Sequence, residues 1–332
     1  MIRRFLEAGD LTGFLRAHRP ERQIAQLTRL AEATTKGVYR ITYEDETTEV
    51  LYVWSAAEDY WPAGPEVAGD PFGSGSGGGV AAFGACHAEL MAAGVRVPRL
   101  HVLDDSREHY PADLVLVEDL AHGTLEDLLN SDAAAAELCL PRLGESLRAM
   151  HDRLGPRFGM VAPGQPGSAD TRNPSGASAA DIVARRALAH LAAGAAMEPR
   201  LAAAQAEVTG LVEAMRAAIR PRAEYRLVHG ELGPDHVLLD DDLAPVIVDI
   251  EGLTFFDVEW EHAFLRLRFE PPQYAALDLP AVDEDRLAFY DLAQRLSLIE
   301  GPLRIATTDY PQREWMLGLA DYQLGRVLSL VS

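Results

Sequence analysis

Two apolar segments in the last third of the chain each end in ionisable side chains. The first apolar run is followed by His229 and Glu231, and the second is followed by Asp249 and Glu251. Carboxylates presented where strands end are suited to hold a hard divalent cation, which in turn binds phosphate oxygens. Phosphoryl transfer is therefore the leading hypothesis for the chemistry of this segment, residues 227–252.

The spacing within the segment is more informative than its composition. Kinase catalytic loops carry His-x-Asp, an Asn five positions further on, and another Asp after a short hairpin. His229, Glu231, His236 and Asp249 occupy these four positions. The segment resembles the His-Gly-Asp-x-x-x-x-Asn and Ile-Asp-Trp motifs of the aminoglycoside phosphotransferase family, whose fold is protein-kinase-like. Glu231 and His236 depart from that pattern, because the family has Asp and Asn there.

Further short matches extend the resemblance over most of the chain. In chain order they cover the end of a helix, a hinge, a helix ending in His and a later acidic pair: Gly94–Pro98, Leu116–Leu128, Leu143–His151, and Asp257 with Glu261. Each match is weak alone, but the matching segments follow one another along the chain in the same order as in a kinase.

Apolar periodicity separates a strand-rich first third from a helix-rich remainder. Residues 1–33 read as one or two helices, a helix over 80–93 ends at Gly94, and period-two runs predict strands at 37–43, 49–54, 99–103 and 113–119. Helices are predicted at 125–129, 138–154, 179–191, 199–219 and from 259 onward, with loops at 70–79 and 155–178. We expect an α+β, two-lobed protein-kinase-like fold, with a small mixed sheet in an N-terminal lobe, 1–119, and a mainly helical C-terminal lobe, 120–332.

The resemblance implies roles for the acidic residues. Asp249 would bind a metal ion that bridges the nucleotide phosphates, and Glu231 would accept the proton of the acceptor hydroxyl. The extra methylene of Glu displaces its carboxylate by more than ~1 Å, which can cost about a hundredfold in rate. An imidazole at His236 is a poorer Mg²⁺ ligand than an amide oxygen, so Asp235 and Glu251 are further candidate ligands. A structural Glu231 and a packed His236 remain alternatives.

The position of the phosphate-binding lysine departs most from the kinase pattern. Kinases carry this Lys on the third strand, where the present chain has Tyr52. Lys36 is the single lysine among 30 basic residues, and it lies at the entry to the first hairpin. We predict that Lys36 binds the nucleotide phosphates, with Arg40 as a weaker substitute and Glu89 as a candidate ion-pair partner. A solvated Lys36 is the alternative.

The nucleotide is expected to be ATP or GTP with Mg²⁺. In the resembling family, the hinge reads the base through main-chain groups, which here fall at Glu118 to Leu120. The glycine-rich run 73–79 lacks the Gly-Lys-Ser/Thr ending of a phosphate loop, so we interpret it as a connector.

Composition excludes several classes of function. The net charge of −21, without a basic cluster, argues against nucleic acid, whereas it suits a cationic acceptor or serves solubility alone. No apolar run is long enough to span a bilayer, and the start soon turns acidic, so we expect no signal peptide, no membrane association and a cytoplasmic location. Cys86 and Cys139 have no ligand-like spacing, which predicts two buried thiols.

The sequence therefore predicts an Mg²⁺-dependent kinase that acts on a hydroxyl group of a small molecule or peptide. Two alternatives stay open. One is a nucleotide-binding pseudokinase that acts as a regulatory or scaffolding partner, motivated by the changes at Tyr52, Glu231 and His236. The other is a non-kinase enzyme that holds a transition metal with the same acidic and histidine side chains.

Overall fold

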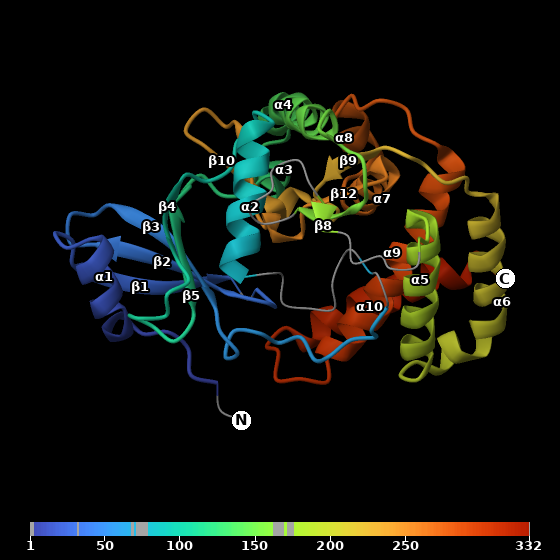
Figure 1. Cartoon of the computed structure of the whole chain (residues 1–332), viewed down its shortest axis with the longest axis horizontal. Helices are drawn as coiled ribbons and strands as arrows, with labels where there is room; N and C mark the ends of the chain where they lie inside the picture. The colour runs from blue at the N-terminus through green and yellow to red at the C-terminus, as the bar shows by residue number, and fades with distance from the viewer. Residues whose placement is uncertain are drawn as a thin grey trace.

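A computed structural model describes residues 3–31, 33–67, 70, 79–161, 169–170 and 176–331. Residues 71–78 of the expected connector, and 162–168 and 171–175 of the expected loop, lie outside these described residues. The elements form a sheet-rich N-terminal part and a largely helical C-terminal part, as the two-lobed prediction requires (Figure 1).

The N-terminal part is built on a five-stranded sheet. Its strands are β1 (Ile24–Ala31), β2 (Gly37–Tyr43), β3 (Thr48–Trp54), β4 (Leu100–Asp104) and β5 (Asp113–Glu118). Their spatial order is β1-β2-β3-β5-β4, and each pairing is antiparallel rather than mixed. The four predicted strands are thus confirmed, with ends shifted by one residue at most.

Strand β1 corrects the helical interpretation of residues 1–33. Helical turns cover only η1 (Ala8–Leu11) and α1 (Thr12–His18), after which the chain becomes extended. A register shift between Ile24 and Gln26 marks a β-bulge, and Ile24 and Leu27 both pack against the same core cluster. A bulge inserts one residue, so positions three apart come to share a face, as they do in a helix. The bulge therefore explains why the spacing looked helical.

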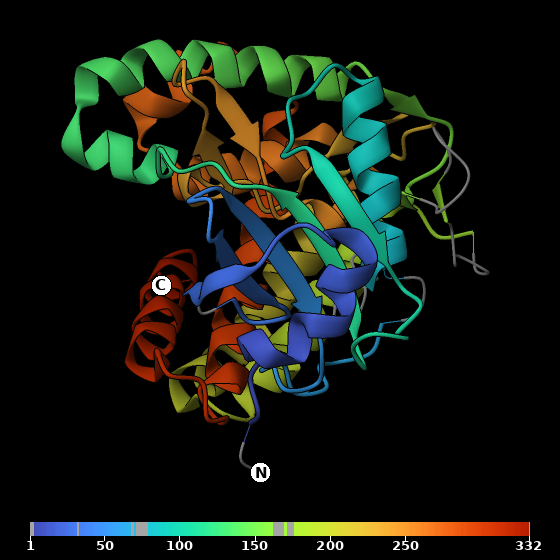
Figure 2. The ribbon, with the colours of Figure 1, turned by 90° about the vertical axis from the view of Figure 1, so that its left-hand side faces the viewer.

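Both faces of the sheet are covered, which explains the continuous apolar runs in its central strands. One face packs against η1 and α1, and Phe14 and Ile41 belong to the core cluster on that side. The other packs against α2 (Gly79–Ala92), with Phe83 near Val115, and α2 stands beside β5 in Figure 2. The chain leaves α2 through Gly94 at φ +77°, so the predicted capping glycine is confirmed.

Helices dominate the C-terminal part, as predicted. They are α3 (Leu125–Ser131), α4 (Ala133–His151), α5 (Ala179–Ala195), α6 (Pro199–Ala218), α7 (Val258–Arg268), α8 (Pro271–Ala276), α9 (Glu284–Ile305) and α10 (Arg313–Leu328). Helix α9 packs against α5, α6, α7 and α10 (Figure 1).

In the helical part the sequence predicted the short hairpin before Asp249, whereas the second sheet was not predicted. A second sheet has the order β6-β9-β12-β7-β8, formed by β6 (Leu154–Gly155), β7 (Gly159–Val161), β8 (Ala169–Asp170), β9 (Tyr225–Val228) and β12 (Thr254–Phe256). A separate hairpin pairs β10 (Val237–Leu239) with β11 (Pro245–Ile247), and 3₁₀ turns η2 (Pro234–His236) and η3 (Ile250–Gly252) flank it. Strands of two to four residues are too short to show a period.

Two further expectations can be compared with the described residues. Cys86 and Cys139 are buried free thiols, as predicted. No described helix combines the length and the apolar character needed to cross a membrane.

The contact between α4 and α8 leads to a stability prediction. A Cβ added at Gly144 of α4 would lie 1.9 Å from the carbonyl oxygen of Leu277, so Gly144→Ala forces the two helices apart. We expect a loss of about 1–3 kcal/mol in the free energy of unfolding, measured by urea denaturation. Gly210→Ala in α6 is the control, because the added Cβ meets no atom within 4 Å. This substitution should raise the free energy of unfolding by about 1 kcal/mol, since Ala favours a helix more than Gly does. Equal effects of the two substitutions would contradict the close packing of α4 against Leu277.

Candidate active site

Asp249 lies at the centre of the candidate site, directly after the hairpin β10–β11. Its backbone is left-handed, with φ 60° and ψ 44°, a conformation that Asp tolerates better than most residues. Its two carboxylate oxygens face different partners. Oδ1 lies 2.6 Å from the Nζ of Lys36, and Oδ2 lies 3.8 Å from the Nε2 of His236.

Lys36 joins Asp249 to a second carboxylate. Its Nζ lies 2.7 Å from the Oε1 of Glu251, and only 5% of the residue is exposed. Burial lowers the pKa of Lys36, but the charges of Asp249 and Glu251 outweigh it, so the pKa ends above its ordinary value. The Lys36 charge in turn holds the pKa of Asp249 below its usual range. The structure thus brings the single lysine to the residue predicted to bind metal.

The other residues of the expected kinase ion pair take different roles. Glu89 of α2 receives hydrogen bonds from Arg153, at 2.9 Å from Nε and 2.5 Å from Nη2. Tyr52 occupies the third-strand position, with the centre of its ring 5.4 Å from the Nζ of Lys36. Lys36 therefore pairs with Asp249 and Glu251, and Glu89 pairs with Arg153.

Glu231 lies in the loop between β9 and η2, with its side chain exposed in the same cavity as Asp249. The surrounding protein partly desolvates its carboxylate although solvent reaches the side chain. This desolvation, followed by the negative charge of Asp249, raises the pKa of Glu231, against the opposing charges of His236, Arg186 and Arg268. A carboxylate with a raised pKa is a better proton acceptor than an ordinary one.

The backbone before Glu231 is held by a buried carboxylate. The amide N–H groups of His229 and Gly230 both donate to Oε2 of Glu261. Burial raises the pKa of Glu261 to about 7, although these two hydrogen bonds lower it. The Nε2 of His229 lies 2.9 Å from the carbonyl oxygen of Val248, and a carbonyl only accepts, so this nitrogen donates. His229 therefore ties the loop to the strand before Asp249.

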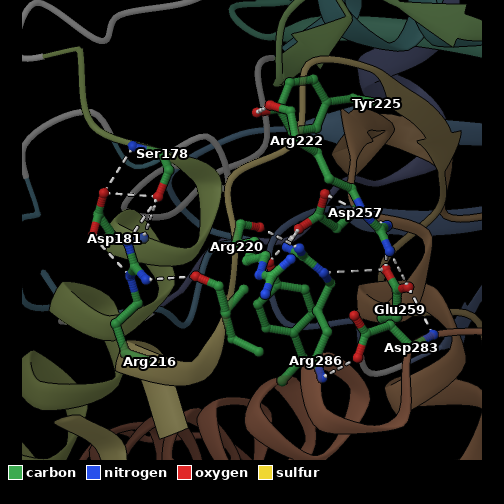
Figure 3. A network of polar contacts seen from close by, with 12 residues as sticks. Ser178, Asp181, Arg216, Arg220, Arg222, Tyr225, Asp257, Glu259, Asp283 and Arg286 are labelled. Atoms are coloured by element: carbon green, nitrogen blue, oxygen red, sulfur yellow. Dashed lines mark hydrogen bonds and ion pairs between the residues drawn. The ribbon is translucent and has the colours of Figure 1, made fainter. Parts of the chain in front are cut away.

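A polar network joins the start of α7 to α9 (Figure 3). Arg286 of α9 lies 2.5 Å from the Oδ2 of Asp257, and Arg222 donates two hydrogen bonds of 2.6 Å to Glu259. The amide N–H of Asp283 also donates to Glu259. Asp257 is buried in this network, away from the cavity lining, so it joins α9 to the start of α7.

The tautomer of His236 would allow its ring to act as a metal ligand. Its Nδ1 lies 2.8 Å from the carbonyl oxygen of Glu231 and must donate to it, which leaves a lone pair on Nε2 in the neutral ring. The Nε2 faces carboxylate oxygens of Asp235 and Asp249, each at 3.8 Å. Among the described residues, no three His, Cys, Asp or Glu side chains could hold a metal ion by themselves. Asp249 and His236 therefore fit a cation that takes further ligands from phosphate and water.

Several other predicted site residues have protein partners of their own. Asp235 pairs with Arg268 at 2.8 Å, and Arg40 donates to Asp119 at 2.6 and 2.9 Å. The side chain of Glu118 accepts from Arg96 Nη2 at 2.6 Å and from Arg99 Nη2 at 2.8 Å, while its main-chain N–H donates to the Arg99 carbonyl at 2.9 Å. Leu120 is half-buried in the connector after β5. Arg40, Glu118 and Leu120 lie outside the cavity lining.

A cavity of about 410 Å³ opens beside Lys36, Glu231 and Asp249. Its lining includes Arg186 of α5 and Arg268 of α7, which the sequence did not single out. No motif distinguishes Arg186 and Arg268 from the other arginines, which make up 29 of the 30 basic residues, and only the packing of the helices brings these two to the site.

Comparisons with known proteins agree with this geometry. The solved structure of aminoglycoside phosphotransferase APH(4)-Ia is 17% identical, with a TM-score of 0.61 over 97% of this chain and 99% of that one. Spectinomycin phosphotransferase APH(9)-Ia, solved with ADP and spectinomycin, is 12% identical, with a TM-score of 0.64 over 98% and 99%. A putative fructosamine-3-kinase from Thermobifida fusca is 18% identical, with a TM-score of 0.52 over 96% and 99%.

These likenesses establish the kinase-like fold. Among curated proteins, no sequence matches the chain. The model of a phosphotransferase enzyme family matches residues 71–290, which is more than half of the chain. The resemblance read from the sequence is therefore confirmed, and the chain belongs to this phosphotransferase family as a divergent member.

Proposed function

We propose that this phosphotransferase moves the γ-phosphoryl group of ATP or GTP, with a divalent cation such as Mg²⁺, to a hydroxyl group of a small molecule. The observation that carries the proposal is the position of Lys36, which bridges Asp249 and Glu251 at a cavity that also contains Glu231. Residues 1–119 would hold the nucleotide, with main-chain groups near Leu120 at the base, and residues 120–332 would hold the acceptor. Kinase-fold enzymes rely on this combination of phosphate positioning and a proton acceptor.

The reaction assigns one step to each group. Glu231 accepts the proton of the acceptor hydroxyl while the hydroxyl oxygen forms a bond to the γ-phosphorus. The bond between the γ-phosphorus and the β–γ bridging oxygen breaks, and the nucleoside diphosphate leaves with the electron pair of that bond. Lys36 stabilises the phosphate charge. A cation held by Asp249 and His236 would supply further charge neutralisation, with Asp235 and Glu251 beside it. The direct test is transfer of label from γ-labelled ATP to an acceptor, which Asp249→Asn should abolish.

Replacing the lysine separates it from the nearest arginine candidate. Lys36→Met leaves Asp249 and Glu251 facing each other without a cation, so we expect kcat/KM for ATP to fall at least about a hundredfold. Arg40→Met removes a residue that pairs with Asp119 outside the cavity, and it should change kcat/KM less than about tenfold. Steady-state kinetics measures kcat/KM for ATP in both variants. An equal loss of kcat/KM in Lys36→Met and Arg40→Met would contradict the assignment of the phosphate role to Lys36.

The raised pKa of Glu231 predicts the acid limb of the pH profile. Because the deprotonated form must accept a proton, kcat/KM should fall as the pH drops through a pKa above the ordinary glutamate value. Glu231→Gln should lower kcat at least about a hundredfold. Partial desolvation disfavours the charged carboxylate in the folded state, so stability is lost as the pH rises above the ordinary pKa, and Glu231→Gln should keep or raise Tm at neutral pH. A fall in both kcat and Tm would indicate a structural Glu231.

The imidazole at position 236 predicts a change in metal preference. Nitrogen ligands favour Mn²⁺ relative to Mg²⁺ more than amide oxygens do, so the ratio of Mn²⁺ to Mg²⁺ affinity should fall about tenfold or more in His236→Asn. Calorimetric titration of each metal in the presence of a non-hydrolysable ATP analogue measures this ratio. His122→Asn is the control, because His122 pairs with the exposed Asp241 and lies outside the cavity lining. An unchanged ratio in His236→Asn would exclude the ring as a ligand.

A further inference from the structure

The cavity beside Glu231 is lined by every tryptophan of the chain. Trp54 ends β3, Trp61 follows in the next connector, Trp260 belongs to α7 and Trp315 to α10. Other apolar side chains extend this surface: Met160, Phe264, Leu298, Ile305, Met316 and Leu319. Three parts of the chain, residues 54–61, α7 and α10, therefore bring tryptophans to one cavity.

Contacts with the protein fix the orientation of Trp61. The indole N–H of Trp61 donates to Oγ1 of Thr34 at 2.9 Å, and a Cβ at Gly301 would lie 3.0 Å from the ring. The guanidinium of Arg304 lies 4.9 Å from the centre of the Trp61 ring. Aromatic surfaces held in this way can bind an apolar ligand with little loss of side-chain entropy.

The described lining itself holds four basic side chains, Lys36 and three arginines, against three acidic ones. Its described acidic residues are Glu231, Asp249 and Glu251, and Lys36 already neutralises the last two in part. Three arginines, at positions 186, 268 and 304, face the same cavity. Their acidic partners, at positions 70, 235 and 300, are not among its lining residues.

Aromatic rings can also attract cations, but Arg304 already lies over Trp61. An ammonium group in the cavity would meet guanidinium groups of the same sign. The expectation of a cationic acceptor, drawn from the net charge of the whole chain, is therefore not supported by the charges that line the site.

We propose that the acceptor is a hydroxyl compound with a large apolar body and no positive charge, bound between the tryptophans with its hydroxyl at Glu231. The proposal rests on the proposed function, because it takes this cavity as the acceptor side of the transfer centre. Such an acceptor would differ in class from hygromycin B and spectinomycin, the compounds bound in two of the structural neighbours.

The test uses a matched pair of ligands and the intrinsic fluorescence of the four tryptophans. Hexyl β-glucoside and 6-aminohexyl β-glucoside share a sugar and an alkyl chain and differ by one ammonium group. We expect the hexyl compound to change the fluorescence saturably, with a Kd at least about tenfold lower than that of the aminohexyl compound. Equal or tighter binding of the aminohexyl compound or of hygromycin B, or no response to the hexyl compound, would overturn the proposal.

Two exposed aromatic residues of α10 provide variants that should fold. Trp315, 57% exposed, lines the cavity, whereas Tyr322, 63% exposed, does not. Trp315→Ala should raise the Kd of hexyl β-glucoside about threefold to tenfold, and Tyr322→Ala should leave it unchanged. Equal effects would contradict the assignment. Nucleotide binding and γ-phosphoryl transfer are measured separately, so a failure of the proposed function is distinguishable from a failure of this ligand class.

Discussion

The ammonium group of Lys36 lies within 2.7 Å of carboxylate oxygens on both Asp249 and Glu251. The lysine precedes β2 of the N-terminal sheet, and the two acids flank the start of η3 in the C-terminal part, so the contact joins the two halves of the molecule. Two carboxylates this close would repel each other without a cation. Removing charges from water is costly, and close pairing with good geometry is what offsets that cost.

The remaining supports keep the loops around this contact in place. Glu261 fixes the backbone before Glu231 through two amide hydrogen bonds, and His229 joins that backbone to the strand before Asp249. The buried pair of Asp257 and Arg286 ties the start of α7 to α9. The acidic residues therefore form two groups. Glu231, Asp249 and Glu251 line the cavity, whereas Asp257 and Glu261 hold the surrounding structure in place. Such support keeps reacting groups within the narrow tolerance that catalysis needs.

Much of the candidate site follows from local spacing in the sequence. Asp249, Glu231 and His236 lie within a few residues of one hairpin, so their distances along the chain largely determine their distances in space. Lys36 could be proposed because the chain has no other lysine. Its pairing with Glu251 could not be predicted, since it depends on how the sheet packs against the helical part. The same holds for the tryptophan lining, and β1 was missed because its bulge imitates helical spacing.

The geometry of an ammonium group gives the Lys36 contact a further meaning. A lysine has three N–H donors arranged as a tripod, whereas the donors of arginine lie in one plane. If Asp249 and Glu251 take two of them, one direction remains for a phosphate oxygen, and the two carboxylates orient it. A planar guanidinium cannot divide its donors among three directions in this way. In a chain whose other 29 basic residues are all arginine, the proposed phosphate role of Lys36 thus depends on the shape of the cation as well as on its sign.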